Sequence, residues 1–71
     1  MSDTPSSESR AELSSLATAL AELTRRVATM AESAASARQQ ELSSELFAVE
    51  RALRGAGRRL ERLVHPGRRV G

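Results

Sequence analysis

Apolar residues recur along this chain in alternating steps of three and four. The pattern occurs in two blocks, which run from Leu13 to Ala37 and from Leu42 to Leu63. Such spacing places apolar side chains on one face of a helix and is typical of coiled coils. The sequence therefore predicts two amphipathic helices and an all-α fold with coiled-coil-like heptads.

The two blocks are out of phase, because five residues separate Ala37 from Leu42. On one continuous helix this step would turn the apolar stripe by roughly 150°. A turn at residues 38–41 removes the conflict and predicts an antiparallel two-helix hairpin, since four residues suit such a connection. The turn contains neither Gly nor Pro, so one long helix stays open as the alternative.

Charges beside the predicted turn favour the hairpin. Arg38 would end the first helix, whereas Glu41 and Glu45 would lie in the first turns of the second. Both placements are favourable for the helix dipoles. Folding the chain here pairs apolar residues whose numbers add up to 83, which places Leu20 opposite Leu63.

Two start sites compete for the first helix, and one stop signal ends the second. Thr4 would cap a helix with Pro5 at its first position, or Ser9 would form a capping box with Glu12. Proline after His65 disfavours helical geometry there. The expected organisation is a disordered or capping lead at 1–8, a helix at 9–37, a turn at 38–41, a helix at 42–65 and a basic tail at 66–71.

Length and composition indicate that the hairpin oligomerises or binds a protein partner. The chain has 71 residues, no Cys and one His, so disulfides are absent and a structural zinc site is disfavoured. Chains below about 80 residues usually need such a staple or oligomerisation. We therefore expect a homo-oligomer, a helical protein partner, or both.

The residues beside the apolar stripe of the first helix favour a bundle. Ala17, Thr24 and Ala31 lie on one side of it, where a simple two-stranded coiled coil more often carries charges. A wider apolar face suits helices with two neighbours, so we expect two hairpins to dimerise into a four-helix bundle. The predicted oligomer or partner seam is Leu13, Leu16, Leu20, Leu23, Val27, Met30, Leu42, Leu46, Val49, Leu53, Leu60 and Leu63.

Two glycines fall inside the second predicted helix, at Gly55 and Gly57. Each costs roughly 1 kcal/mol relative to Ala in a helix interior. They indicate either a kink or the close approach of a neighbouring helix, and the sequence leaves both open.

The sequence gives little support for a catalytic activity. His65 is the single imidazole and lies where the second helix ends, a position at which His commonly meets exposed carbonyls. Glu41 and Glu45 share a helix face, but no His or Cys accompanies them. We expect no enzyme activity, no metal and no cofactor.

Arginine is concentrated at the end of the chain. Residues 51–71 contain seven Arg and one acid, Glu61, whereas residues 1–35 have a net charge of −2. The candidate anion or acidic-partner face comprises Arg51, Arg54, Arg58, Arg62, Arg68 and Arg69. It is either a solvated face, with Glu50 pairing to Arg54, or a surface for an acidic protein, a nucleic acid or an anionic membrane. No aromatic residue interleaves with these arginines to stack on bases.

Targeting signals are also not evident. The first ten residues are polar and acidic, unlike a secretory signal. The longest apolar run, Leu46 to Val49, is far shorter than the roughly 20 residues of a membrane span. We expect a cytoplasmic, non-catalytic adaptor or scaffold, with a nucleic-acid-associated protein as the alternative.

Overall fold

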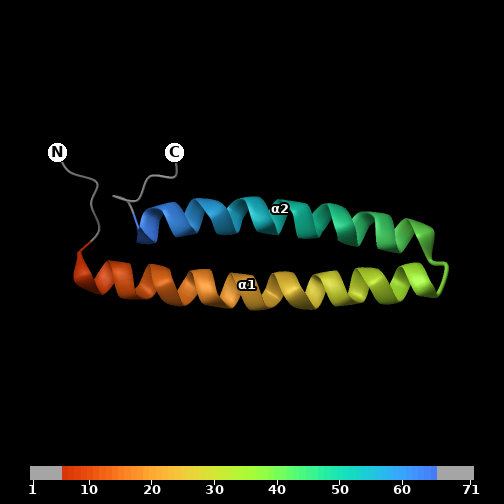
Figure 1. The fold of residues 1–71 in the computed structure, drawn as a ribbon, viewed down its shortest axis with the longest axis horizontal. Coiled ribbons are helices and arrows are strands. Elements are labelled where there is room, and N and C mark those ends of the chain that lie inside the picture. Colours follow the sequence, from red (N-terminus) through yellow and green to blue (C-terminus); the bar gives the residue numbers. More distant parts are fainter. Residues whose placement is uncertain (1–5, 66–71) are drawn as a thin grey trace.

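Two long helices pack side by side in antiparallel directions (Figure 1). The computed structural model describes residues 6–65, in which α1 spans Ser7–Ser36 and α2 spans Gln40–Val64. No strand occurs within this range. The predicted all-α pair of packed helices is confirmed, and the alternative of one long helix is wrong.

Helix α1 begins earlier than predicted. Ser6 is its N-cap, and the Ser6 hydroxyl accepts a hydrogen bond of 3.2 Å from the backbone N–H of Ser9. Glu8 adds a favourable negative charge in the first turn. Ser9 is therefore a donor inside the helix and not the cap, and the Thr4 and Pro5 alternative lies outside the described residues.

One residue in the turn between the helices has a left-handed backbone conformation. Arg38 has φ +63°, and its N–H donates to the carbonyl of Ala35 at 3.0 Å. The N–H of Gln39 reaches back to the carbonyl of Ala34 at 2.9 Å. This pair of bonds is a Schellman motif, in which Arg38 takes the position that Gly usually occupies. The predicted turn was 38–41, with Arg38 at the end of the first helix, whereas residues 37–39 connect the helices in the structure.

The side chains between the helices repeat every three or four residues. We call this set the hairpin seam. It comprises Leu13, Ala17, Leu20, Thr24, Val27, Ala31 and Ala34 from α1, and Ser43, Leu46, Glu50, Leu53, Gly57, Leu60 and Val64 from α2, all buried or half-buried. Its buried members are small or medium-sized: Ala17, Thr24, Ala31, Ala34, Ser43 and Val64.

The register of the two helices differs from the predicted one. A Cβ atom on Gly57 would lie 3.8 Å from Cδ2 of Leu20, so these two residues face each other. Their numbers add up to 77 and not 83, because the turn lies earlier in the chain than expected and because the two helices meet through a different set of side chains. Leu63 is consequently not opposite Leu20. A Cβ atom on Gly57 would make only an ordinary contact with α1, and α2 stays helical through both glycines.

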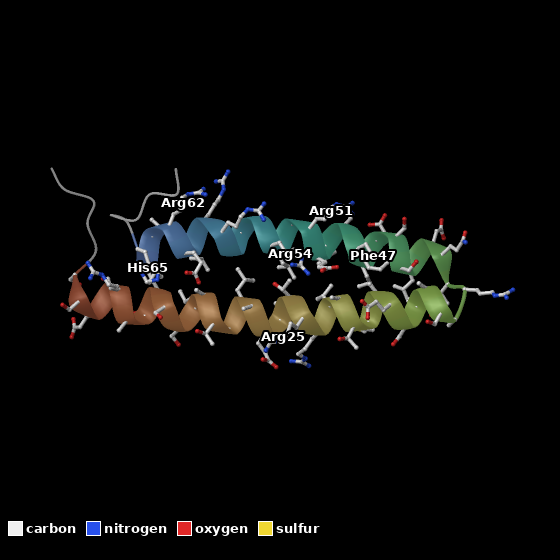
Figure 2. The ribbon with its side chains drawn as sticks, in the orientation of Figure 1. Arg25, Phe47, Arg51, Arg54, Arg62 and His65 are labelled. Carbon is white, nitrogen blue, oxygen red and sulfur yellow. The ribbon has the colours of Figure 1, made fainter. Side chains whose placement is uncertain are left out.

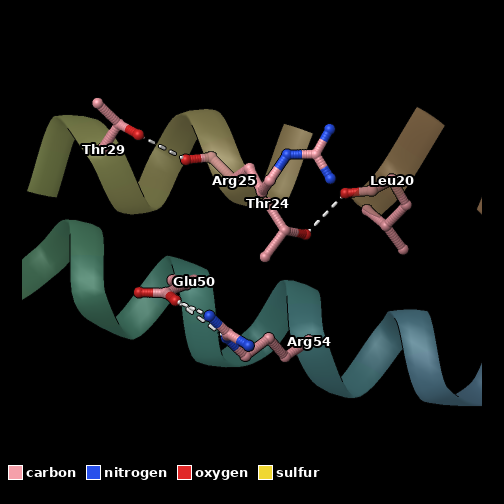
Figure 3. A network of polar contacts seen from close by, with 6 residues as sticks. All are labelled: Leu20, Thr24, Arg25, Thr29, Glu50 and Arg54. Atoms are coloured by element: carbon pink, nitrogen blue, oxygen red, sulfur yellow. Dashed lines mark hydrogen bonds and ion pairs between the residues drawn. The ribbon is translucent and has the colours of Figure 1, made fainter. Parts of the chain in front are cut away.

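Polar residues within the seam satisfy their own hydrogen bonds. The Thr24 hydroxyl donates to the carbonyl of Leu20 at 2.7 Å, and the Ser43 hydroxyl donates to the carbonyl of Gln40 at 3.1 Å (Figure 3 shows the first). Among residues 6–65, no buried side-chain nitrogen or oxygen lacks a partner. Small side chains and satisfied hydroxyls allow the two helices to approach closely.

Candidate functional site

Six large apolar side chains of the hairpin are exposed. Their exposed fractions lie between 43% and 60%, with Met30 the highest. We call this set the apolar flank, which comprises Leu16, Leu23 and Met30 from α1 and Leu42, Val49 and Leu63 from α2. A patch of this kind is uncommon on an isolated domain and typically marks an interaction site.

The six residues share one side of the hairpin. On α1 each flank residue directly precedes a seam residue, as Leu23 precedes Thr24. The same holds on α2, where Val49 precedes Glu50. Antiparallel helices are related by a local twofold axis perpendicular to their plane, so equivalent positions emerge on the same side. The flank is thus a set of exposed apolar side chains that both helices contribute to one side of the hairpin.

The predicted twelve-residue seam is divided by the structure. Six of its members lie in the hairpin seam: Leu13, Leu20, Val27, Leu46, Leu53 and Leu60. The other six form the apolar flank and do not lie between α1 and α2. Sequence reasoning missed the small seam residues of α2, Ser43 and Gly57, whose heptad spacing from Val64 was the available signal.

The opposite side of the hairpin has a different composition. Phe47 and Ala28 are half-buried there, and Ala21 and Ala35 carry only a methyl group. This side therefore presents one large apolar residue, which is already partly covered. Of the two sides, the apolar flank is therefore the one that exposes large apolar side chains.

An acidic residue occupies the middle of the hairpin seam. The Glu50 side chain is only 12% exposed, and its carboxylate accepts a hydrogen bond of 2.9 Å from Nε of Arg54 (Figure 3). Arg54 keeps 60% of its side chain exposed. The structure thus contains the expected pair, with the carboxylate inside the seam and the guanidinium at its edge.

Three exposed arginines of α2 form a surface that we call the basic face. Arg51, Arg58 and Arg62 are exposed, and Figure 2 shows Arg51 and Arg62 on the side of α2 that points away from α1. Arg54 belongs to the pair with Glu50. The two remaining members of the predicted face, Arg68 and Arg69, lie outside the described residues.

His65 lies at the C-terminal end of α2. Its backbone N–H donates to the carbonyl of Glu61 at 2.9 Å, and its Nε2 lies 3.8 Å from Oε1 of the same residue. Across the range that the structure describes, no three His, Cys, Asp or Glu residues gather where they could hold a metal ion. The arrangement at His65 suits helix termination.

Comparisons with protein families, curated proteins and solved structures found no significant match to this chain. Neither described helix combines the length and hydropathy needed to cross a membrane. The functional argument therefore rests on the apolar flank and the basic face themselves.

Proposed function

We propose that this chain is a non-catalytic, cytoplasmic interaction protein, a small oligomeric coiled-coil adaptor or scaffold. The observation that carries this proposal is the apolar flank, whose six large side chains are 43% to 60% exposed at heptad spacing. Heptad-spaced apolar residues on two adjacent helices present ridges and grooves suited to further helices.

The balance of burial supports association. The buried residues of the hairpin are small or medium-sized, and no large side chain among residues 6–65 is fully buried. Covering the exposed parts of six Leu, Val and Met side chains would add roughly 1 kcal/mol for each. A chain of this length needs such a contribution, because a core this small barely offsets the entropy of folding.

Sedimentation equilibrium at micromolar chain concentration tests the proposal. We expect a mass above the 7.7 kDa of one chain. Met30→Lys should shift the mass towards that of one chain, because its flank side chain is exposed in the hairpin and would be covered only by association. Thr29→Lys is the matched control, since the neighbouring Thr29 is exposed outside the flank. A wild-type chain that stays monomeric with full helicity would overturn the proposal.

A second candidate function rests on the basic face. Arg51, Arg58 and Arg62 are exposed and, between residues 6 and 65, form no ion pair. Such a row of guanidinium groups would bind the phosphates of a nucleic acid with a strong dependence on salt. In a mobility-shift assay at low salt, Arg58→Glu with Arg62→Glu should abolish binding, whereas Arg25→Glu on α1 should weaken it less. No shift of the wild-type chain at low salt would remove this candidate.

A further inference from the structure

We propose that the apolar flank is covered by a second copy of this chain whose turn lies at the opposite end, so that Glu45 of each copy pairs with Arg59 of the other. In this arrangement α1 packs against α1 and α2 packs against α2, each pair antiparallel. The inference rests on the proposed function and adds to it the occupant, its orientation and the two residues that select that orientation.

Glu45 and Arg59 lie beside the flank on α2, near its two ends. Glu45 follows Leu42 by three positions, and Arg59 precedes Leu63 by four. Residues three or four apart are neighbours on the surface of a helix. Both side chains are exposed, and neither forms an ion pair with another of residues 6–65. The α2 part of the flank thus has an unpaired negative charge near one end and an unpaired positive charge near the other.

The α2 part of the flank matches itself when a second copy runs in the opposite direction. Full overlap places Leu42 level with Leu63 of the other copy, so that residues at one level have numbers that add up to 105. Val49 is then level with Ala56, and facing helices fill the space between them by such pairing of large and small residues. A twofold axis across the helices generates each of these contacts twice.

The same overlap brings opposite charges together. Glu45 of each copy lies within one residue of the level of Arg59 of the other, which gives two ion pairs. Glu41 and Arg62, which directly precede the two end residues of the α2 flank, come within two residues of one level, again with opposite charges. Complementary charges of this kind fix the orientation in which two surfaces associate.

The position of α1 in this dimer follows from that of α2. Gly57 faces Leu20, so residues of α1 and α2 at one level have numbers that add up to between 77 and 79. For α1 against α1 of the other copy, the numbers then add up to about 51. This brings Leu23 within two residues of the level of Met30 of the other copy, so that the α1 part of the flank is covered as well.

The charges beside the flank on α1 were included in this comparison. Glu12 comes level with the turn of the other copy, which contains Arg38. Arg26 comes close to Arg26 of the other copy. The arrangement therefore has one like-charge contact on α1, which the two ion pairs of α2 outnumber.

With the turns at the same end, the charges beside the flank find no charged partner. In that orientation α1 of each copy meets α2 of the other. Glu45, Arg59 and Arg26 would then lie level with Ser33, Ala19 and Ala52 of the other copy. Glu12 would lie level with His65, which is neutral at pH 7. Only the orientation with the turns at opposite ends pairs Glu45 with Arg59.

The size of the flank favours a second hairpin as the occupant. From Leu42 to Leu63 the flank is about 30 Å long, and two adjacent helices are about 20 Å wide, which gives roughly 600 Å² on each copy. The total of roughly 1,200 Å² is at the lower limit for a specific, stable interface. A single additional helix would cover only about half of this width.

Exchange of the two charges tests the pairing. Glu45→Arg and Arg59→Glu should each raise the dissociation constant of the dimer roughly tenfold, because each removes two ion pairs and creates two like-charge contacts. The double variant rebuilds both pairs with reversed polarity, so its constant should return to within about threefold of the wild-type value. Sedimentation equilibrium over a series of chain concentrations measures these constants.

Arg58→Glu is the matched control, because it makes the same change of charge one residue before Arg59, on the basic face. It should leave the dissociation constant within about threefold of the wild-type value. Both exchanged charges oppose the dipole of α2, so any loss of helicity in far-UV circular dichroism should be greatest in the double variant. Restored association in that variant would therefore report the pairing. A double variant as weak as the single ones would overturn the inference.

Spin-label distances test the orientation independently. The chain contains no Cys, so Gln39→Cys at the turn and Ala11→Cys near the other end each introduce a single labelling site. With the turns at opposite ends, both variants should give distances of about 40 Å or more between the two labels, set by the length of the helices. Distances of about 20–30 Å in both variants, set by the width of the bundle, would overturn the inference.

The failure of this inference is distinguishable from that of the proposed function. An oligomer with short label distances, without rescue by the charge exchange, or with a mass other than that of two chains would overturn only the inference. A fully helical monomer would overturn both.

Discussion

The hairpin seam and the apolar flank lie one residue apart on each helix but are built in opposite ways. The buried members of the seam are Ala17, Ala31 and Ala34 with Thr24, Ser43 and Val64, none of them larger than valine. The flank consists of leucines, a valine and a methionine that are roughly half exposed. The comparison teaches that small and medium-sized side chains are buried in the contact between the helices, whereas the exposed large apolar side chains lie beside it.

Charge placement extends this contrast. Glu50 lies within the seam with its partner Arg54 four residues later, a spacing that brings the two side chains together on one helix. The flank contains no charged residue, and exposed charged residues lie beside it, with Arg26 three positions after Leu23 and Glu45 three positions after Leu42. The seam thus tolerates a neutralised charge, whereas the flank keeps charge at its rim.

The largest expected difference comes from placing a carboxylate in each region. Leu53→Asp would bury an unpaired charge in the seam and should cost on the order of 3 kcal/mol or more. Leu23→Asp changes a flank residue that is 45% exposed, and its effect should act on association and diminish on dilution. Urea titrations followed by far-UV circular dichroism at several chain concentrations measure both. Equal destabilisation of the two variants at the lowest concentration would contradict the comparison.

A second test enlarges one alanine in each region. Ala31 has no exposed surface, so Ala31→Leu should force the helices apart and cost about 1–3 kcal/mol. Ala56 is exposed seven residues after the flank residue Val49, and Ala56→Leu should leave the hairpin nearly unchanged. Thermal unfolding of the two variants at matched concentration measures the difference. If Ala31→Leu were tolerated as well as Ala56→Leu, the seam would not depend on close approach.

The turn that sets the register offers a smaller test. Arg38 has φ +63°, so Arg38→Gly should stabilise the hairpin by about 1 kcal/mol by relieving left-handed strain. Arg38→Ala is the control, because it removes the guanidinium and keeps the Cβ atom. Chemical denaturation of the three proteins measures the effect. Stabilisation by Ala equal to that by Gly would assign it to the side chain and not to the backbone.

The smallest effects are expected at the glycines of α2. A Cβ atom at Gly57 would meet Leu20 at 3.8 Å, an ordinary contact, and one at Gly55 would meet the Arg58 side chain at the same distance. Gly57→Ala and Gly55→Ala should each stabilise the hairpin by somewhat less than 1 kcal/mol through helix propensity. Melting temperatures measure the gains. A loss at Gly57 alone would mean that the seam is tighter than this distance indicates.

The sequence predicted the number and the pairing of the helices because the five-residue step after Ala37 cannot be continued on one helix face. It did not predict the three-residue turn, since nothing in the sequence indicates that Arg38 adopts a conformation usually left to glycine. The position of the turn explains part of the error in register, and the assignment of the large apolar residues to the contact explains the rest.

The division of the apolar stripe was harder to predict. Assigning the largest apolar residues to the contact is reasonable when helices are about equally spaced, but two helices lined with alanine can approach more closely. Ala17, Thr24 and Ala31 recur every seven residues, and that period was the signal for the seam. The position of Glu50 inside the seam was not predictable from an apolar pattern, because its burial depends on the salt bridge to Arg54. The function assigned to the flank and to the arginines stays a prediction.

The alanine content of the seam has a further consequence, for the entropy of folding. Ala17, Ala31 and Ala34 have no side-chain rotamers to lose, so closing the hairpin at these positions restricts only the backbone. Leu16, Leu23 and Met30 remain free to change rotamer while they are exposed. If the proposed partner covers the flank, the large side chains would lose their rotamer entropy at that step, and the contact with the partner would have to offset this loss.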